Sequence, residues 1–233
     1  MRRLSALELI ELSEAGASLG PAGRALLLLE ASGAMTRAAA EGLSLGARER
    51  WLLTLRAAQF GPVLEMQQNC GACDVQFEFR LTAADLGMDR VVLPPENAQR
   101  IVHPAGAPVP VRAVTAGDLA ATEGLRDPAE ARSLLRTRIA PGGDAIDDDE
   151  LDTILAELDP DAELAIAAAC PDCGATQTVM LDLAAFIWRE IELRIPRLLQ
   201  QVADLAHAFH WSERDILALP AARRRYYLTA AGA

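Results

Sequence analysis

The residues of this chain with the clearest capacity for chemistry are its four cysteines, which form two CxxC motifs. They are Cys70 and Cys73 in the first motif and Cys170 and Cys173 in the second. The segments around them, residues 64–86 and 164–186, align without a gap at an offset of 100 positions. Each copy predicts an extended run, a CxxC turn, a second extended run and then the start of a helix. We therefore interpret the two copies as halves of one unit.

Two such motifs supply the ligands of a four-thiolate zinc site. A tight turn, or knuckle, lets both cysteines of one motif point at the same ion, and zinc binds four thiolates tetrahedrally. Gly174 follows the second motif where the chain needs a positive φ angle, and Asp74, which tolerates that conformation better than most residues, takes its place in the first. We predict one structural zinc ion, because four cysteines leave no open position for a substrate.

Other uses of the cysteines have to be weighed against this one. A thioredoxin-type redox dithiol places its CxxC at a helix N-terminus, whereas the strand-like residues Val75, Phe77 and Phe79 follow the first motif. Disulfide formation is a second alternative, but a cytosolic chain keeps its thiols reduced. Four unrelated buried cysteines would leave the doubled spacing unexplained. Paired CxxC motifs favour the shared metal site.

The composition describes an acidic globular protein. The chain has 233 residues, of which 51% are hydrophobic, so it can form a substantial core. Its net charge is −11 and arginine carries every positive charge, which makes general nucleic-acid binding unfavourable. No apolar run approaches the roughly 20 residues that a membrane span needs, and no signal peptide is visible. We expect a soluble, cytoplasmic protein.

The pattern of elements predicts an α+β fold, mainly helical, in which the two CxxC hairpins form one zinc-ribbon-like unit. The predicted segments are an N-terminal helical module (1–62), the paired hairpins (63–86 and 160–182), an inserted small β/α region (87–159) and C-terminal helices (183–233). Apolar periodicity and capping residues predict helices at 4–14, 21–31, 46–59, 118–123, 128–139 and 147–158. Three short strands are predicted at 91–93, 101–102 and 109–114.

The C-terminal segment carries the longest apolar stripe, over residues 183–209. Pro196 lies inside it, so we expect either a kink or two helices meeting at 195–196. Ser212 is a predicted N-cap for the next helix, with Asp215 completing a capping box. A last helix is expected from Ala221 to Leu228.

Three further residue patterns could have a functional role, and each also has a structural interpretation. His207 and His210 have a spacing that could ligate a metal, but such a pair is more often a packing or surface feature. The acidic run 147–150 fits the positive end of a helix better than an ion site. Arg223–Arg225, beside two tyrosines, hints at DNA binding, whereas the plainer interpretation is pairing with the protein's own carboxylates or with an acidic partner.

Beyond these patterns, the chain resembles the T4-type phage baseplate protein family, which includes baseplate hub assembly proteins and relatives encoded with phage-tail-like contractile injection systems. The resemblance rests on residues 45–62, both CxxC hairpins, 111–121 and, most specifically, 185–228, ending in WSERDILALPAARRRYYL. The chain departs from the family's pattern at Asp74 and Pro196. The resemblance covers most of the chain, with residues 87–110 matching only loosely.

The resemblance implies a non-enzymatic structural component or assembly factor of a baseplate, with other baseplate or hub subunits as partners and no small-molecule substrate. It leaves two expectations open, namely a cytoplasmic factor that departs after assembly and a subunit incorporated into the particle. As contact surfaces we expect the Trp211–Tyr227 end and the helix at 45–60. The alternative function is a zinc-ribbon nucleic-acid-binding or regulatory adaptor that uses Arg223–Arg225, and a redox protein is a third hypothesis.

Overall fold

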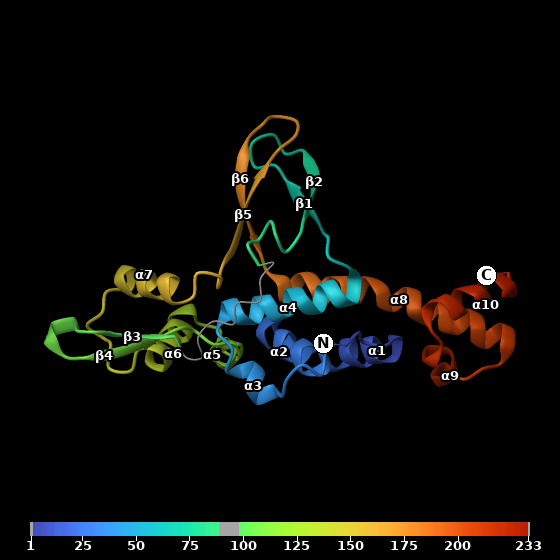
Figure 1. The fold of residues 1–233 in the computed structure, drawn as a ribbon, viewed down its shortest axis with the longest axis horizontal. Helices are drawn as coiled ribbons and strands as arrows, with labels where there is room; N and C mark the ends of the chain where they lie inside the picture. The colour runs from blue at the N-terminus through green and yellow to red at the C-terminus, as the bar shows by residue number, and fades with distance from the viewer. Residues whose placement is uncertain (1, 89–97, 233) are drawn as a thin grey trace.

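The computed structural model describes residues 2–88 and 98–232. Within these residues it is an α+β structure, mainly helical, with three antiparallel two-stranded sheets. Figure 1 shows a layer of helices along the long axis of the molecule, from which two hairpins rise side by side. The predicted fold class is confirmed at this level.

The N-terminal residues form a layer of helices, as predicted, with one unexpected element. The helices are α1 (Ala6–Ala15), α2 (Pro21–Ala31), α3 (Arg37–Glu41) and α4 (Leu45–Phe60). Ser5 and Glu8 make a reciprocal capping box at the start of α1, and Ser44 caps α4. The short helix α3 was not predicted, because five residues are too few to display an apolar stripe at helical spacing.

The two CxxC hairpins have the same register. The strands are β1 (Leu64–Asn69) and β2 (Gln76–Leu81) in the first hairpin, and β5 (Leu164–Ala169) and β6 (Thr176–Leu181) in the second. The outermost pair is Leu64 with Leu81 in one and Leu164 with Leu181 in the other, and every pair between them also matches at the offset of 100. The sequence repeat is therefore a repeat of backbone pairing.

The copies diverge directly after their second strands. The second copy continues into α8 (Leu183–Phe209), whose N-cap is Asp182. In the first copy, Asp85 accepts hydrogen bonds from the N–H and hydroxyl of Thr82 at 2.7 Å each, but only a turn follows. The helix start predicted there is wrong, because Gly87 (φ 66°) adopts the left-handed conformation and ends the first turn.

The inserted region contains a small core of its own. Its elements are β3 (Gln99–Val102), a 3-10 turn (Pro104–Gly106), β4 (Val109–Arg112), α5 (Ala116–Thr122), α6 (Pro128–Ile139) and α7 (Asp148–Leu158). Two of the three predicted strands are present as the β3–β4 pair, and the one predicted at 91–93 lies outside the described residues. Val109, Val111, Ile139 and Ile154 are buried together between this sheet and α6–α7.

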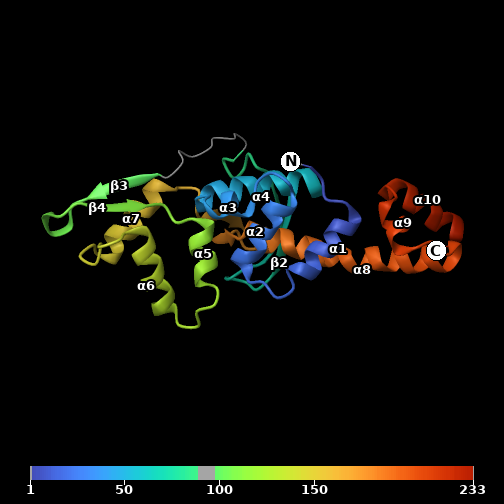
Figure 2. The same ribbon diagram turned by 90° about the horizontal axis from the view of Figure 1, so that it is seen from below.

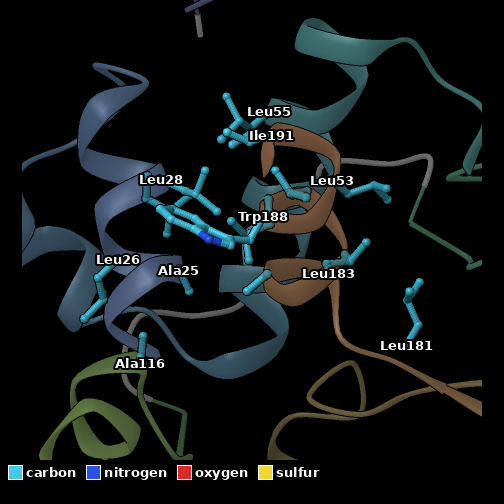
Figure 3. Packing of buried hydrophobic residues seen from close by; sticks show 14 of the residues in the cluster. Ala25, Leu26, Leu28, Leu53, Leu55, Ala116, Leu181, Leu183, Trp188 and Ile191 are labelled. Atoms are coloured by element: carbon cyan, nitrogen blue, oxygen red, sulfur yellow. The ribbon is translucent and has the colours of Figure 1, made fainter. Parts of the chain in front are cut away.

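The main core lies between α2, α4 and the first half of α8 (Figure 3). Trp188 on α8 is 2% exposed, and the N–H of its indole donates to Glu192 at 2.8 Å. The leucines at the bases of both hairpins join the same cluster; they are Leu64, Leu81, Leu164 and Leu181. The hairpins are thus fixed to the helical layer by apolar burial at their bases.

The C-terminal end consists of the second half of α8 with α9 (Glu213–Ala218) and α10 (Ala221–Ala231). Ser212 caps α9, as predicted, by accepting from the N–H of Asp215 at 3.2 Å. The alternative of two helices meeting at 195–196 is wrong, because α8 continues through Pro196 as one helix. Packing of its first half in the main core and of its second half against α9 and α10 offsets the hydrogen bond that proline removes.

Candidate metal centre

The tips of the two hairpins bring all four cysteine sulfurs together. The Sγ atoms of Cys70 and Cys173 are 3.6 Å apart, those of Cys73 and Cys170 are 3.8 Å apart, and all four lie within 4.8 Å of one another. A tetrahedral ion with metal–sulfur bonds of about 2.3 Å places its sulfurs about 3.8 Å from each other. The thiols are free, since a disulfide needs about 2.05 Å. The group could hold a metal ion.

Backbone hydrogen bonds within each CxxC turn hold its two sulfur atoms on the side that faces the other hairpin. In the first knuckle the N–H of Cys70 donates to the C=O of Val75, and the N–H of Asp74 donates to the C=O of Cys70, both at 2.9 Å. The second knuckle repeats these hydrogen bonds 100 positions later at 2.9 and 3.0 Å. Asp74 has φ 61° and Gly174 has φ 72°, so the predicted left-handed positions are confirmed.

The four thiols are so close together that the ionisation of each one changes the pKa values of the others. Backbone N–H groups of Ala72 and Cys73 direct hydrogen bonds at the sulfur of Cys70 and lower its pKa to about 7. The N–H of Val75 acts to lower the pKa of Cys73, but the neighbouring sulfurs, led by Cys173, outweigh it and raise that pKa to about 12. Four thiolates at these distances repel one another, so their joint ionisation requires a cation among them.

An apolar layer lies beneath the sulfurs. Cys70 and Cys170 are buried, and Phe77, Ala168 and Val179 pack with them in a small cluster separate from the main core. Cys73 and Cys173 are exposed. The site therefore has a dry inner side and an open outer side, through which an ion can enter.

Gln177 joins the two hairpins directly and was not singled out from the sequence. Its side-chain oxygen accepts from the N–H of Gly71 at 2.9 Å, and its side-chain nitrogen donates to the C=O of Asn69 at 3.1 Å. The repeat itself contained a signal for this contact. Position 177 is the equivalent of Phe77, and it is polar in one copy where the other buries an aromatic ring.

The other candidate ligands do not form a comparable site. In residues 2–88 and 98–232, the cysteines are the one group of three or more His, Cys, Asp or Glu side chains that could hold a metal. His210 is the left-handed C-cap residue of α8. In the acidic run, Asp147 caps α7 and Asp148 pairs with Arg136 at 2.5 Å, in agreement with a role at the helix end.

The arginine triplet is not a free basic surface. Arg224 is 5% exposed, and its guanidinium donates to the C=O of Leu219 at 2.7 Å and to the side chain of Gln201 at 3.3 Å. Burial lowers the pKa of Arg224. The middle arginine thus holds α9, α10 and α8 together, which leaves only Arg223 and Arg225 exposed.

Comparison of the chain with protein-family models, curated proteins and solved structures gave no match. None of the helices in the described parts of the chain combines the length and apolar character needed to cross a bilayer.

Proposed function

We propose that the four cysteines bind a single structural zinc ion. The proposal is carried by the cross-hairpin distances of 3.6 and 3.8 Å, which match the edge of a tetrahedral thiolate site. Sites with four sulfur ligands hold zinc or iron–sulfur clusters. The thiols of Cys70, Cys73, Cys170 and Cys173 are too close together to surround more than one ion. With all four positions taken by cysteines, the ion has a structural role and no substrate position.

The ion joins segments that are a hundred residues apart in the sequence. The hairpins lead into and out of the inserted region, and their bases are buried in the main core. Metal binding at their tips therefore holds the two hairpins together at the end away from the main core. Because such a site does not exist in the unfolded chain, the free energy of metal binding adds to the free energy of folding.

We further propose that the protein is a non-enzymatic structural component or assembly factor of the baseplate of a phage tail or a phage-tail-like contractile injection system. The observation that carries this proposal is a partly exposed aromatic cluster within residues 185–228, the stretch in which the resemblance to baseplate proteins is most specific. Phe209 stacks on Trp211 with ring centroids 4.8 Å apart, and Trp211 packs edge-on against Tyr227 at 4.9 Å. Tyr226, beside them, is 71% exposed.

An aromatic cluster of this kind is typical of a protein contact site. Large rings that are partly exposed supply much of the binding free energy in protein interfaces. The cluster lies at one end of the elongated molecule, at the junction of α8 and α10 (Figure 1). Its partners in this proposal are other baseplate or hub subunits, and assembly takes place in the cytoplasm.

Mass spectrometry of contractile particles purified from the host tests the proposed function. A permanent subunit is present in finished particles, whereas an assembly factor is present only in baseplate precursors. Absence from both would overturn the assignment. The metal is tested separately, by measuring zinc in the purified protein, where we expect one ion per chain.

A further inference from the structure

An open groove of about 820 Å³ lies near the C-terminal end, away from the metal centre. It is lined by the start of α1, the middle of α8 and the α9–α10 pair. Figure 2 shows α1 and the α9–α10 pair along the same side of α8. We call it the arginine groove after the residues that give it its charge: Arg3, Arg194, Arg197, Arg224 and Arg225.

The charge of the arginine groove is opposite to that of the whole protein. The chain has a net charge of −11, yet no aspartate or glutamate lines this groove. Three carboxylates near this end of the molecule accept hydrogen bonds from residues outside the groove. Glu192 accepts from Trp188, Asp204 from Gln200 and Asp215 from Ser212. The positive charge of the groove is therefore not neutralised locally.

The arginines of the groove also differ from those elsewhere in their pairing. Eleven arginines form salt bridges in the described residues, and none of the five groove arginines is among them. Arg194 packs over the ring of Phe60 at 4.3 Å, and Arg224 is buried against carbonyl groups. Arg197 and Arg225 are exposed, and their guanidinium groups make no hydrogen bond or ion pair with the described part of the chain. These two guanidinium groups are available to a ligand.

The remaining lining residues define the class of ligand. They include the apolar side chains Leu4, Leu9, Leu198, Leu217 and Pro220. A guanidinium group binds a carboxylate through two parallel hydrogen bonds, and apolar walls bind apolar side chains. A segment that carries both carboxylates and apolar residues satisfies the whole lining. Nucleic acid fits less well, since the groove offers no aromatic ring for base stacking and the protein as a whole repels phosphates.

We propose that the arginine groove binds an acidic, partly apolar segment of a partner protein, through Arg197 and Arg225. The proposal rests on the proposed function in one respect, because it assumes that the protein assembles with other chains. It names the chemistry by which one such chain is recognised. Attraction between the acidic segment and a positive groove in an otherwise negative surface also selects the orientation of docking.

Fluorescence anisotropy with a short labelled peptide of alternating glutamate and leucine tests this. The full chain should bind it, and binding should weaken as salt is added. Replacing both arginines (Arg197→Gln with Arg225→Gln) should weaken binding by about ten-fold per arginine. Arg189→Gln is the control for each single replacement, since Arg189 is exposed on α8 outside the groove and its loss changes the net charge by the same one unit as the loss of either groove arginine.

Four results would overturn the proposal. One is equal binding of a peptide with glutamine in place of glutamate, and another is unchanged binding by the double variant. The third is that a second copy occupies the groove, seen as self-association in sedimentation that the double variant abolishes. A single-stranded DNA oligonucleotide serves as competitor, and its displacing the peptide at lower concentration than unlabelled peptide would favour nucleic acid instead. The peptide-binding results do not affect the mass spectrometry of particles, so the groove and the proposed function are tested independently.

Discussion

The side-chain oxygen of Gln177 accepts a hydrogen bond from the backbone N–H of Gly71 at 2.9 Å, across the tips of two hairpins that are otherwise joined there by sulfur and apolar contacts. The same side chain also donates to the C=O of Asn69. One residue of the second hairpin thus satisfies two backbone groups of the first. The side-chain amide of Gln177 therefore helps to keep the two cysteine pairs facing each other, and this contact does not require a metal ion.

Replacing Gln177 by methionine tests this contact. Gln177→Met keeps the length of the side chain but removes both hydrogen bonds, so we expect the free energy of unfolding to fall by about 1–2 kcal/mol. Metal affinity should fall roughly ten-fold, as for other residues that orient ligands. Urea unfolding and a competition titration with a metal indicator measure the two effects. Gln67→Met is the control, since Gln67 is exposed on β1, and an equal loss there would contradict the assignment.

Removing the metal should loosen the hairpins and the insertion between them. We expect a strong chelator, or Cys70→Ser, to lower the melting temperature, because metal binding contributes to folding. The serine variant should bind less than one ion per chain. Ala165→Ser, at an exposed position of β5, provides the control for introducing serine. A chelator that leaves both the melting temperature and amide hydrogen exchange of the hairpin tips unchanged would exclude a structural metal.

Gly16 is required because the indole of Trp188 approaches it closely. A Cβ atom added at Gly16 would lie 2.0 Å from the Trp188 ring, which is buried in the main core and cannot move freely. We expect Gly16→Ala to reduce stability by about 1–3 kcal/mol through overpacking. Gly124→Ala is the matched control, since nothing lies within 4 Å of a Cβ there. Thermal unfolding of both variants distinguishes the clash from a general effect of replacing glycine.

Asp118 should make the protein sensitive to acid. Burial acts to raise the pKa of its carboxyl group, but hydrogen bonds from Arg112, Thr115 and Arg138 outweigh burial and lower it well below its usual range. A carboxyl group whose pKa is lower in the folded state contributes stability above its unfolded pKa, about 3.9, and this contribution is lost as the pH falls below it. Urea unfolding at several pH values measures the effect.

The corresponding variant, Asp118→Asn, should be less stable at pH 7 by about 2 kcal/mol, because the charge-assisted hydrogen bonds are lost. Its stability should also depend less on pH between about 4 and 2. Asp144→Asn is the control, since Asp144 is exposed on a loop. An identical acid dependence in the wild type and in Asp118→Asn would show that another carboxylate is responsible.

Much of the fold follows from local signals in the sequence. The CxxC spacing and the repeat at an offset of 100 predicted two hairpins, and the structure has both, with positive φ angles at Asp74 and Gly174. Helix positions followed from periodicity and caps such as Ser44 and Ser212. These signals succeed because a turn or a cap is decided by neighbours within a few residues. The cysteine cluster was predictable for a different reason, since two equivalent CxxC motifs together supply the four ligands of one metal site.

Two carboxylates cap helices that are distant from them in the sequence, and local sequence patterns do not predict such contacts. Glu123 accepts hydrogen bonds from the N–H groups of Ala22 and Gly23, and Asp159 accepts one from Gly46 at 2.8 Å. They cap α2 and α4 from 100 or more residues away. A cap supplied from a distant element leaves no spacing pattern near the helix it stabilises. The sequence therefore predicted these helices, with Ser44 as the local cap of α4, but not the distant carboxylates that also bind their N-termini.

The sequence by itself determined most of the secondary structure, the four thiols and their grouping into two equivalent turns, because each depends on residues close together in the chain. Only the tertiary structure decided which groups meet across the molecule. It buried Arg224 while leaving Arg197 and Arg225 exposed in a groove free of carboxylates, and it placed Gln177 against Gly71. The physical reason is that charge compensation and hydrogen bonding act over a few ångströms in space, whatever the separation along the chain.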